Sequence, residues 1–385
     1  MSVQQWRITG RRRFDPMSIS EVGHFRLKPS GTGDSASLID DPNISLYCLD
    51  EKNRKAVFVE TDPDVDLRKY PFYYQGQFQH ARQLLTIDYE EFHRLAENLA
   101  TRIQCAVMIH SVGRCGSTFL SQLFDRLHEC VSLSEPDVQT QICAASYDDA
   151  EKTQLLRSST AFYFNPSANQ PATHLVMKFR SFCVEMADLM YESFQPQVPL
   201  FLYRDIESVV TSGMRVFRYF GAPLWAVDVG HKLWFTRPIL SWLFKLNMPI
   251  GRQFFPFIDR FSPNELARMG PVAILTIAWV SSMQTYKRFF ENGLPFFAVR
   301  YDDLVQQPKQ TMEQILDRCQ LPIEKSGELL DALDRDSQEG SVVSRSGRKK
   351  WELRSKDRDV IREVLSRHDE ICEIDYELPG TLACT

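Results

Sequence analysis

The chain has 385 residues, of which 43% are hydrophobic and 25% charged, a composition typical of globular proteins rather than of disordered or fibrous ones. At roughly 150 residues per domain, this length suggests two to three domains. The formal net charge is −5, whereas general nucleic-acid binders are usually basic, so we expect no nucleic-acid partner.

Nine cysteines are scattered along the chain without a CxxC pair, which indicates reduced thiols used as small apolar residues. The N-terminal stretch is basic but contains no apolar core of the kind found in signal peptides. The sequence also lacks an uncharged apolar run of about 18 residues, so it predicts no membrane span. We therefore expect a soluble cytoplasmic protein; the oligomeric state cannot be inferred.

Residues 1–100 show no recognisable chemistry and are expected to form an N-terminal extension of unknown role. Within them, 29–43 is rich in Gly, Ser, Asp and Pro and predicts a loop or linker. Short β-like stretches follow at 44–48 and 56–60. Helical spacing of apolar residues predicts a helix over 88–99.

Residues 101–385 alternate between apolar runs and helical patterns. Strands are predicted at 105–110, 175–179, 198–203 and 295–301. Helices are predicted over 117–130, from 206 onward, and over 308–319. This alternation indicates an α/β fold with a parallel sheet covered by helices on both faces.

The strongest local signal is the segment HSVGRCGSTFLSQLF at 110–124, between a predicted strand and a predicted helix. Gly113 and Gly116 allow a tight turn and a close approach of the backbone to a ligand. The helix that follows presents its first amides to an anion. Arg114 adds a planar cation suited to phosphate or sulfate oxygens.

This loop is not a Walker A motif, which requires G-x-x-x-x-G-K-[ST]. Ser111 stands at the first glycine position, Ser117 stands at the lysine position, and the cation lies upstream at Arg114. The loop therefore predicts a phosphate site without the lysine that grips a γ-phosphate. The simpler alternative is a strand-to-helix turn with an exposed arginine.

Two further segments carry cations in positions that suit anion binding. Arg204 ends an apolar strand, and Ser212 lies eight residues on in the next helix. Ligands of parallel sheets bind at the carboxyl ends of the strands, so this pair can contact a second phosphate. The segment 341–351 gathers four cations around Gly347 in an acidic protein. A capping arginine and a solvated loop are the simpler alternatives.

Together these segments resemble sulfotransferases that use 3′-phosphoadenosine 5′-phosphosulfate (PAPS). The loop 111–119 resembles their 5′-phosphosulfate loop in an arginine-containing variant, and Arg204 with Ser212 matches their 3′-phosphate motif. The segment 299–316 resembles their Arg-Tyr-Glu-Asp-Leu region, and Arg345-Ser346-Gly347 their late nucleotide-covering segment. The resemblance spans roughly 104–355. It implies a P-loop-type three-layer fold with a central parallel sheet and no metal. The residues that it implies for PAPS binding are Arg114, Cys115, Gly116, Ser117, Thr118, Arg204, Ser212, Arg345, Ser346 and Gly347.

Sulfonyl transfer needs positive charge near the bridging oxygen and a base for the acceptor proton. Arg114 suits the first role, and Lys178 resembles the family's strand-end lysine. Cytosolic members carry a histidine two residues after that lysine, but Arg180 stands here and cannot accept a proton. Glu135 resembles the acidic residue of other branches and is the preferred base. Two weaker candidates are His110 and His174.

The segment 217–261 is the most aromatic part of the chain and defines an aromatic-rich insertion expected at about 215–270. It predicts either a helical insertion with its own core or a lid over an apolar acceptor pocket. The second possibility favours transfer to a hydroxyl or amine of a small, apolar acceptor rather than of a polysaccharide. Two other functions remain open: a P-loop kinase or nucleotide phosphotransferase, and a non-catalytic nucleotide-binding module of the same fold.

Overall fold

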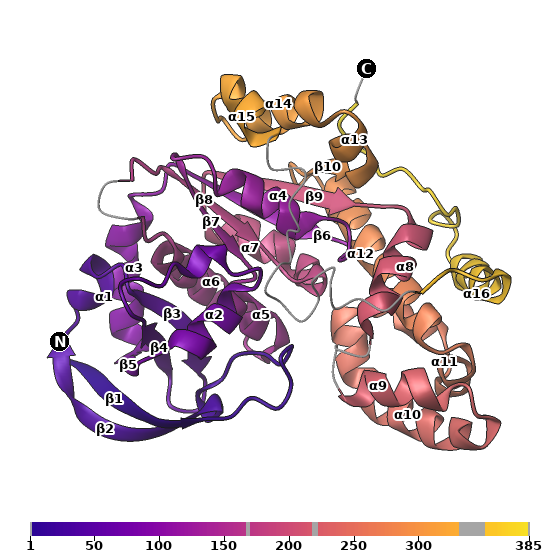
Figure 1. Ribbon diagram of the computed structural model, residues 1–385, viewed down its shortest axis with the longest axis horizontal. Helices are drawn as coiled ribbons and strands as arrows, with labels where there is room; N and C mark the ends of the chain where they lie inside the picture. The colour runs from indigo at the N-terminus through magenta and orange to yellow at the C-terminus, as the bar shows by residue number, and fades with distance from the viewer. Residues whose placement is uncertain (1, 167–169, 218–221, 331–350, 384–385) are drawn as a thin grey trace.

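Two five-stranded sheets organise the computed structural model, which describes residues 2–383 except 167–169, 218–221 and 331–350 (Figure 1). One sheet is antiparallel with the order β2-β1-β5-β4-β3, and the other is parallel with the order β10-β9-β6-β8-β7. The parallel sheet occupies the middle of the molecule, and the antiparallel sheet lies on the N-terminal side (Figure 1).

The antiparallel sheet belongs entirely to the first hundred residues. Its elements are β1 (Ser2–Arg11), β2 (Phe25–Asp34), α1 (Ser37–Asp40), β3 (Ile44–Asp50), β4 (Lys55–Glu60), α2 (Tyr73–His80), β5 (Gln83–Asp88) and α3 (Tyr89–Ala100). The strands expected at 44–48 and 56–60 and the helix expected at 88–99 are confirmed. The loop expected at 29–43 is wrong, because β2 pairs with β1 as far as Asp34 and α1 follows.

The parallel sheet consists of β6 (Cys105–Ser111), β7 (Cys130–Ser134), β8 (His174–Lys178), β9 (Gln197–Tyr203) and β10 (Phe297–Arg300). Four of these strands were predicted from their apolar runs. β7 was not, because two of the five residues in its short sequence CVSLS are serine, although all five are buried. The helix expected over 117–130 accordingly ends earlier, at Phe124.

Helices cover both faces of the parallel sheet, so the predicted three-layer α/β fold is confirmed. Residues of α4, α8 and α12 pack on one side and residues of α5 and α6 on the other. The described helices after residue 101 are α4 (Ser117–Phe124), α5 (Asp137–Ala144), α6 (Asp149–Tyr163), α7 (Ala187–Ser193), α8 (Ile206–Val216), α9 (Ala222–Gly230), α10 (Arg237–Phe254), α11 (Pro263–Met269), α12 (Pro271–Glu291), α13 (Tyr301–Gln306), α14 (Pro308–Arg318), α15 (Ser326–Leu330) and α16 (Ser355–Leu365).

Alternate residues of β6 face different cores, as the two-residue period of a strand requires. Val107 and Ile109 pack into the core that contains α4, α8 and α12. Ala106 and Met108 pack into the core that contains α5 and α6, and this core continues into the antiparallel sheet. The ring of Phe162 illustrates that continuity, since it lies 5.1 Å from Phe58 of β4. The two sheets therefore share a hydrophobic core.

The strand order brings several of the predicted site residues, among those that the structure describes, to one edge of the parallel sheet. β6 lies in the centre, and the chain builds first on its β8 side and then on its β9 side. Ligands of such sheets bind beyond the carboxyl ends of the strands at this switch point. The loop after β6, Glu135 after β7, Lys178 ending β8, Arg204 after β9 and Tyr301 after β10 all lie at those ends.

The aromatic segment 217–261 forms α9, the short helix η5 (Trp234–Thr236), α10 and the short helix η6 (Pro256–Arg260). Its aromatic side chains fall into two groups. Phe257 and Phe261 are buried in the core beside α12, whereas Trp234 and Trp242 are 77% and 58% exposed. The expected helical core therefore accounts for only part of the segment, and these two tryptophans do not close over a pocket in this conformation.

Among the described helices, none is by itself long and apolar enough to cross a membrane. The pair formed by α11 and α12 passes the same length and composition test only together, with a bend of 116° between them.

Candidate active site

The backbone of the loop after β6 has the left-handed conformations that an anion-binding turn requires. Gly113, Arg114 and Gly116 have φ values of 73°, 55° and 88°. Gly116 caps α4 without a side-chain hydrogen bond, so the first amides of α4 point toward the sheet edge. A Cβ at Gly116 would lie 2.6 Å from Cδ2 of Tyr301, so glycine is required there for space as well as for backbone conformation.

Three of the predicted loop side chains are turned inward. The Cys115 thiol is buried and donates to the Leu202 backbone oxygen over 3.3 Å, and burial raises its pKa. Ser111 Oγ donates to Ser117 Oγ over 3.2 Å, and Ser117 and Thr118 are both buried. Cys115 can therefore offer a ligand only its backbone amide, while the two hydroxyl groups lie in the first turn of α4.

Arg114 joins the loop to the helix after β9. Its Nε donates to Ser212 Oγ over 3.3 Å, and both side chains are partly exposed. These two residues belong to motifs that are 98 positions apart in the sequence. The fold thus places the loop cation beside the serine that the sequence assigns to the 3′-phosphate.

Arg204 lies at the carboxyl end of β9, on the other side of Tyr301. Its guanidinium is 4.5 Å from the centre of the Tyr301 ring, and its Nε is 3.8 Å from Asp205 and 4.0 Å from Asp302. Trp279 Nε1 donates to the Arg204 backbone oxygen over 2.9 Å and holds the main chain there. The cation is therefore oriented by an aromatic face and two carboxylates, but 29% of its side chain remains exposed.

Tyr301 links the two anion-binding elements, since its ring contacts both Gly116 and Arg204. It belongs to the segment 299–316, for which the sequence predicted a resemblance but no role for this tyrosine. The available signal was its position, because an aromatic residue directly after a parallel strand lies at the edge where ligands bind.

Glu135 and Lys178 form a buried ion pair at the ends of β7 and β8. Lys178 Nζ donates to Glu135 Oε1, and the side chains of Lys178 and Glu135 are only 6% and 8% exposed. Glu135 Oε2 lies 3.8 Å from Arg180 Nε, so the carboxylate faces two cations. Its backbone has a positive φ of 58°, and its amide donates to the Lys178 oxygen over 2.7 Å. Strained backbone of this kind clusters at functional sites.

Arg180 extends this pair into a larger charged cluster that the N-terminal region covers. Its Nη2 lies 2.8 Å from Oδ1 of the fully buried Asp137, and its Nη1 donates to the Met17 oxygen over 2.7 Å. The ring of Tyr74 packs 4.7 Å from the guanidinium. Ser20 donates its amide to Asp137 Oδ2 over 2.6 Å. Residues 17–20 and α2 thus form one wall of the site, a role that the sequence analysis did not give them.

The two histidines considered as bases are poorly placed for that role. His110 is buried between the rings of Phe179 and Phe296, and burial lowers its pKa to about 3. His174 begins β8, at the opposite sheet edge from Lys178, and burial lowers its pKa as well. His110 lies near the carboxyl end of β6, but its ring is enclosed by aromatic side chains, whereas Glu135 lies at that sheet edge and contacts Lys178.

Three predicted nucleotide ligands, Arg345, Ser346 and Gly347, lie outside the described residues. Over the described parts of the chain, there is no group of three or more His, Cys, Asp or Glu residues that could hold a metal ion.

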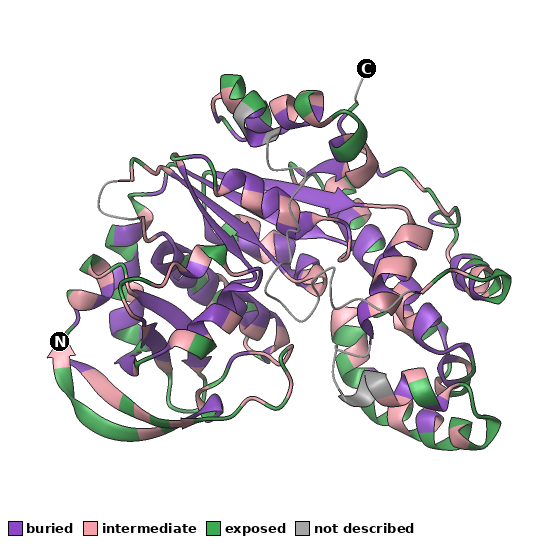
Figure 2. Ribbon diagram, viewed as in Figure 1, coloured by how far each residue is buried: buried purple, intermediate pink, exposed green. Residues whose placement is uncertain are grey.

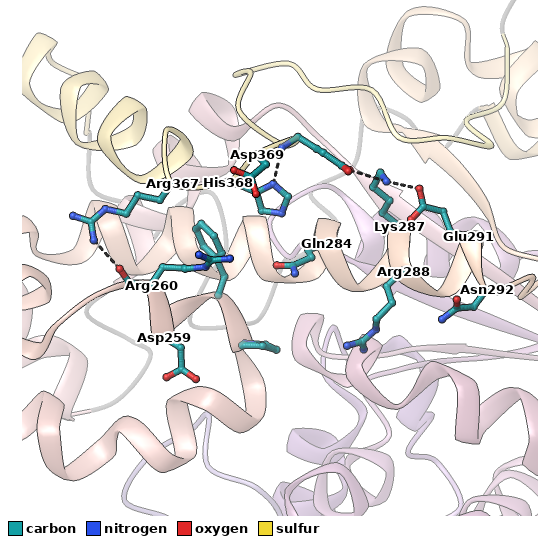
Figure 3. A pocket seen from close by; sticks show the side chains of 13 residues that line it. Asp259, Arg260, Gln284, Lys287, Arg288, Glu291, Asn292, Arg367, His368 and Asp369 are labelled. Carbon is teal, nitrogen blue, oxygen red and sulfur yellow. Dashed lines mark hydrogen bonds and ion pairs between the residues drawn. The ribbon is translucent and has the colours of Figure 1, made fainter.

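A cavity of about 410 Å³ lies elsewhere, between η6, α12 and the turn after α16 (Figure 3). None of the predicted site residues lines it. Its lining mixes both charges, and Lys287 lies 2.7 Å from Glu370 within it. Arg367 donates to the backbone oxygen of Arg260 over 2.7 Å. We therefore place the candidate active site at the sheet edge and not in this cavity.

No family model matches the sequence, and no curated protein matches it. Solved structures similar to the chain include the sulfotransferase domain from the curacin biosynthetic pathway, with a TM-score of 0.37, 16% identity, and coverage of 71% of this chain and 98% of that chain. The sulfotransferase domain from the Synechococcus PCC 7002 olefin synthase has a TM-score of 0.35 and 13% identity, with coverage of 72% of this chain and 96% of that chain. A sulfotransferase from Alicyclobacillus acidocaldarius has a TM-score of 0.38 and 11% identity, with coverage of 70% of this chain and 96% of that chain. Similarity this low does not establish an activity, so the function has to rest on the site itself.

Proposed function

We propose that the chain is a PAPS-dependent sulfotransferase that transfers a sulfonyl group to a hydroxyl or amine of a small, apolar acceptor. The observation that carries the proposal is that two arginines follow neighbouring strands, β6 and β9, at the central switch point of the parallel sheet. Arg114 contacts Ser212, and Arg204 packs against the ring of Tyr301. Two cations from neighbouring strand ends suit a nucleotide with phosphate groups at two positions.

The residues present fit the donor in the following way. The backbone amides at the start of α4 and the Arg114 guanidinium bind the 5′-phosphosulfate. Arg204 and Ser212 bind the 3′-phosphate. Tyr301 keeps Arg204 in position and packs directly on Gly116, so the two subsites have a fixed separation. Arg345, Ser346 and Gly347 are proposed to cover the nucleotide, on the sequence resemblance alone.

PAPS supplies the sulfonyl group, with 3′-phosphoadenosine 5′-phosphate as the leaving group, and the chain supplies charge and a proton acceptor. Lys178 and Arg114 stabilise the negative charge that develops on the oxygens around sulfur. Glu135 takes the proton from the acceptor hydroxyl or amine. In the structure Glu135 binds Lys178 directly, so both groups must exchange this contact for contacts with the substrates. Breaking this contact frees the Glu135 carboxylate to accept the acceptor proton and the Lys178 ammonium to contact the sulfonyl oxygens.

The small apolar acceptor is the part of the proposal that rests on the aromatic composition of 217–261. A matched pair of acceptor sets tests it: phenols, sterols and lipid alcohols against anionic polysaccharides. Preference for the polysaccharides would contradict the apolar acceptor without affecting the assignment of PAPS. We propose a cytoplasmic location, which the eight free cysteines among the described residues support.

The proposal is tested by turnover of radiolabelled PAPS with the acceptor sets, using ATP as the alternative donor. Transfer of label from PAPS supports a sulfotransferase, and phosphate transfer from ATP would instead indicate the kinase alternative. Tight binding of the nucleotide without any transfer would indicate the non-catalytic module.

A further inference from the structure

The exposed apolar surface of the protein is concentrated on one helical segment. Of the eleven large hydrophobic side chains exposed among the described residues, eight lie between Val229 and Ile250. They are Val229, Leu233, Trp234, Phe235, Ile239, Trp242, Leu246 and Ile250. We call these eight residues the α10 surface. Scattered exposed apolar residues need no explanation, but many of them concentrated on one short segment point to an interaction site.

On α10 the exposed residues follow a helical period. Ile239, Trp242, Leu246 and Ile250 are spaced by three and four residues, so they share one face of the helix. The opposite face carries Leu240 and Met248, which are buried against the protein. α10 therefore has two apolar faces, of which the protein itself covers one (Figure 2). A helix that is apolar on both faces is expected to be covered on both.

The charged residues within 229–258 are all basic. Between Asp228 and Asp259 the sequence contains Lys232, Arg237, Lys245 and Arg252 and no acidic residue, although the whole chain has a net charge of −5. Lys232 and Arg252 pair with the two bounding aspartates. Within the described residues, no ion pair holds Arg237 or Lys245, and both are exposed. These two cations would complement an anionic partner.

We propose that the α10 surface docks on a lipid bilayer that carries anionic headgroups. Exposed tryptophans beside an aliphatic stripe, with lysine and arginine at its margins, are the pattern of helices that lie in the membrane interface. The long cationic side chains reach the headgroups while the stripe enters the acyl boundary. At about 1.5 Å per residue, α10 would lie along the membrane over roughly 27 Å.

A second copy of the chain fits this surface poorly. A two-fold dimer places the same patch of both copies face to face, which would bring Arg237 and Lys245 of one copy against those of the other. Like charges at an interface are unfavourable. An anionic bilayer meets both requirements of the surface, since it offers negative headgroups and an apolar interior together.

The experiment measures binding of the full chain to vesicles of phosphatidylcholine with and without phosphatidylserine, by co-sedimentation and tryptophan emission. We expect binding and a blue shift only when phosphatidylserine is present. Trp242→Ser with Leu246→Ser should weaken partitioning at least about tenfold, because the apolar anchor is lost. Phe14→Ser is the matched control, since Phe14 is 80% exposed outside the surface, and it should bind as the wild type does.

Charge is tested separately with Arg237→Gln and Lys245→Gln, each expected to weaken binding about fivefold. Lys52→Gln removes an exposed cation elsewhere and should have no effect. Equal binding to both kinds of vesicle, or full binding by the Trp242 and Leu246 variant, would overturn the proposal. A concentration-dependent dimer that this variant abolishes, without vesicle binding, would assign the surface to self-association instead. None of these readouts depends on sulfonyl transfer.

Discussion

Glu135→Gln tests the buried pair most sharply, because it removes charge with almost no change in size. Glu135 and Lys178 are 8% and 6% exposed, so the variant leaves a buried ammonium beside the Arg180 guanidinium without its carboxylate. Breaking a buried pair in this way costs about 3–5 kcal/mol of unfolding free energy. Lys178→Met should cost less, about 1–3 kcal/mol, because Glu135 keeps Arg180 at 3.8 Å.

The double variant should lose less unfolding free energy than the two single variants lose together. The difference, which is the coupling energy of the pair, should be about 2 kcal/mol. Chemical denaturation of the four proteins measures this cycle. Additive losses would mean that the two groups do not interact in solution and would refute the geometry from which the mechanism starts.

The same variants separate structure from catalysis. Glu135→Gln should lower kcat by roughly 100-fold while changing PAPS affinity little, as expected when a proton acceptor is lost. Glu185→Gln is the matched control: Glu185 is a half-buried carboxylate that accepts a hydrogen bond from Thr285 and lies outside the proposed site. Its kcat should stay at the wild-type value. Near-wild-type kcat in Glu135→Gln would remove Glu135 as the base.

Three further outcomes follow from the site. Arg204→Ala should weaken PAPS binding by about 1.5–3 kcal/mol and hardly affect adenosine 5′-phosphosulfate, which lacks the 3′-phosphate; equal losses would contradict the assignment. Sulfonyl transfer should survive EDTA, because Arg114 and Lys178 supply the positive charge, and inactivation reversed by Mg²⁺ would argue for the kinase. Because burial lowers the pKa of His110 to about 3 from 6.5, its neutral form stabilises the fold above pH 6.5. That contribution should fall by up to about 1.4 kcal/mol per pH unit as the pH drops from 6.5 toward 3, and denaturation of His110→Leu should show a flatter pH profile.

The parallel sheet was largely predictable because its strands are buried on both faces. Such strands read as continuous apolar runs, and four of the five were found in this way. The strand β7 was not predicted because its two serines interrupt the apolar run, although the strand is fully buried. In the antiparallel sheet, β1 and β2 carry many exposed polar residues, and their pairing depends on each other and not on a local pattern.

The candidate site likewise contains residues that local sequence patterns predicted and contacts that only the fold reveals. Glycines, cations and strand ends in 110–124 and around Arg204 are local signals, and the structure places both segments at the carboxyl ends of neighbouring strands. The contacts of Arg180 with Met17 and Tyr74 join segments more than one hundred residues apart, so no local pattern could reveal them. Tyr301 is an intermediate case, since its sequence position was noticed but its packing on Gly116 required the fold.

The most direct test of the central claim is calorimetric titration of the full chain with 3′-phosphoadenosine 5′-phosphate, compared with ATP. Two arginines at adjacent strand ends predict that the 3′,5′-bisphosphate binds at least about tenfold more tightly than ATP, since only it offers phosphates to both. Arg204→Ala should abolish that preference. ATP binding as tightly as the bisphosphate, or a preference that survives in Arg204→Ala, would contradict the account.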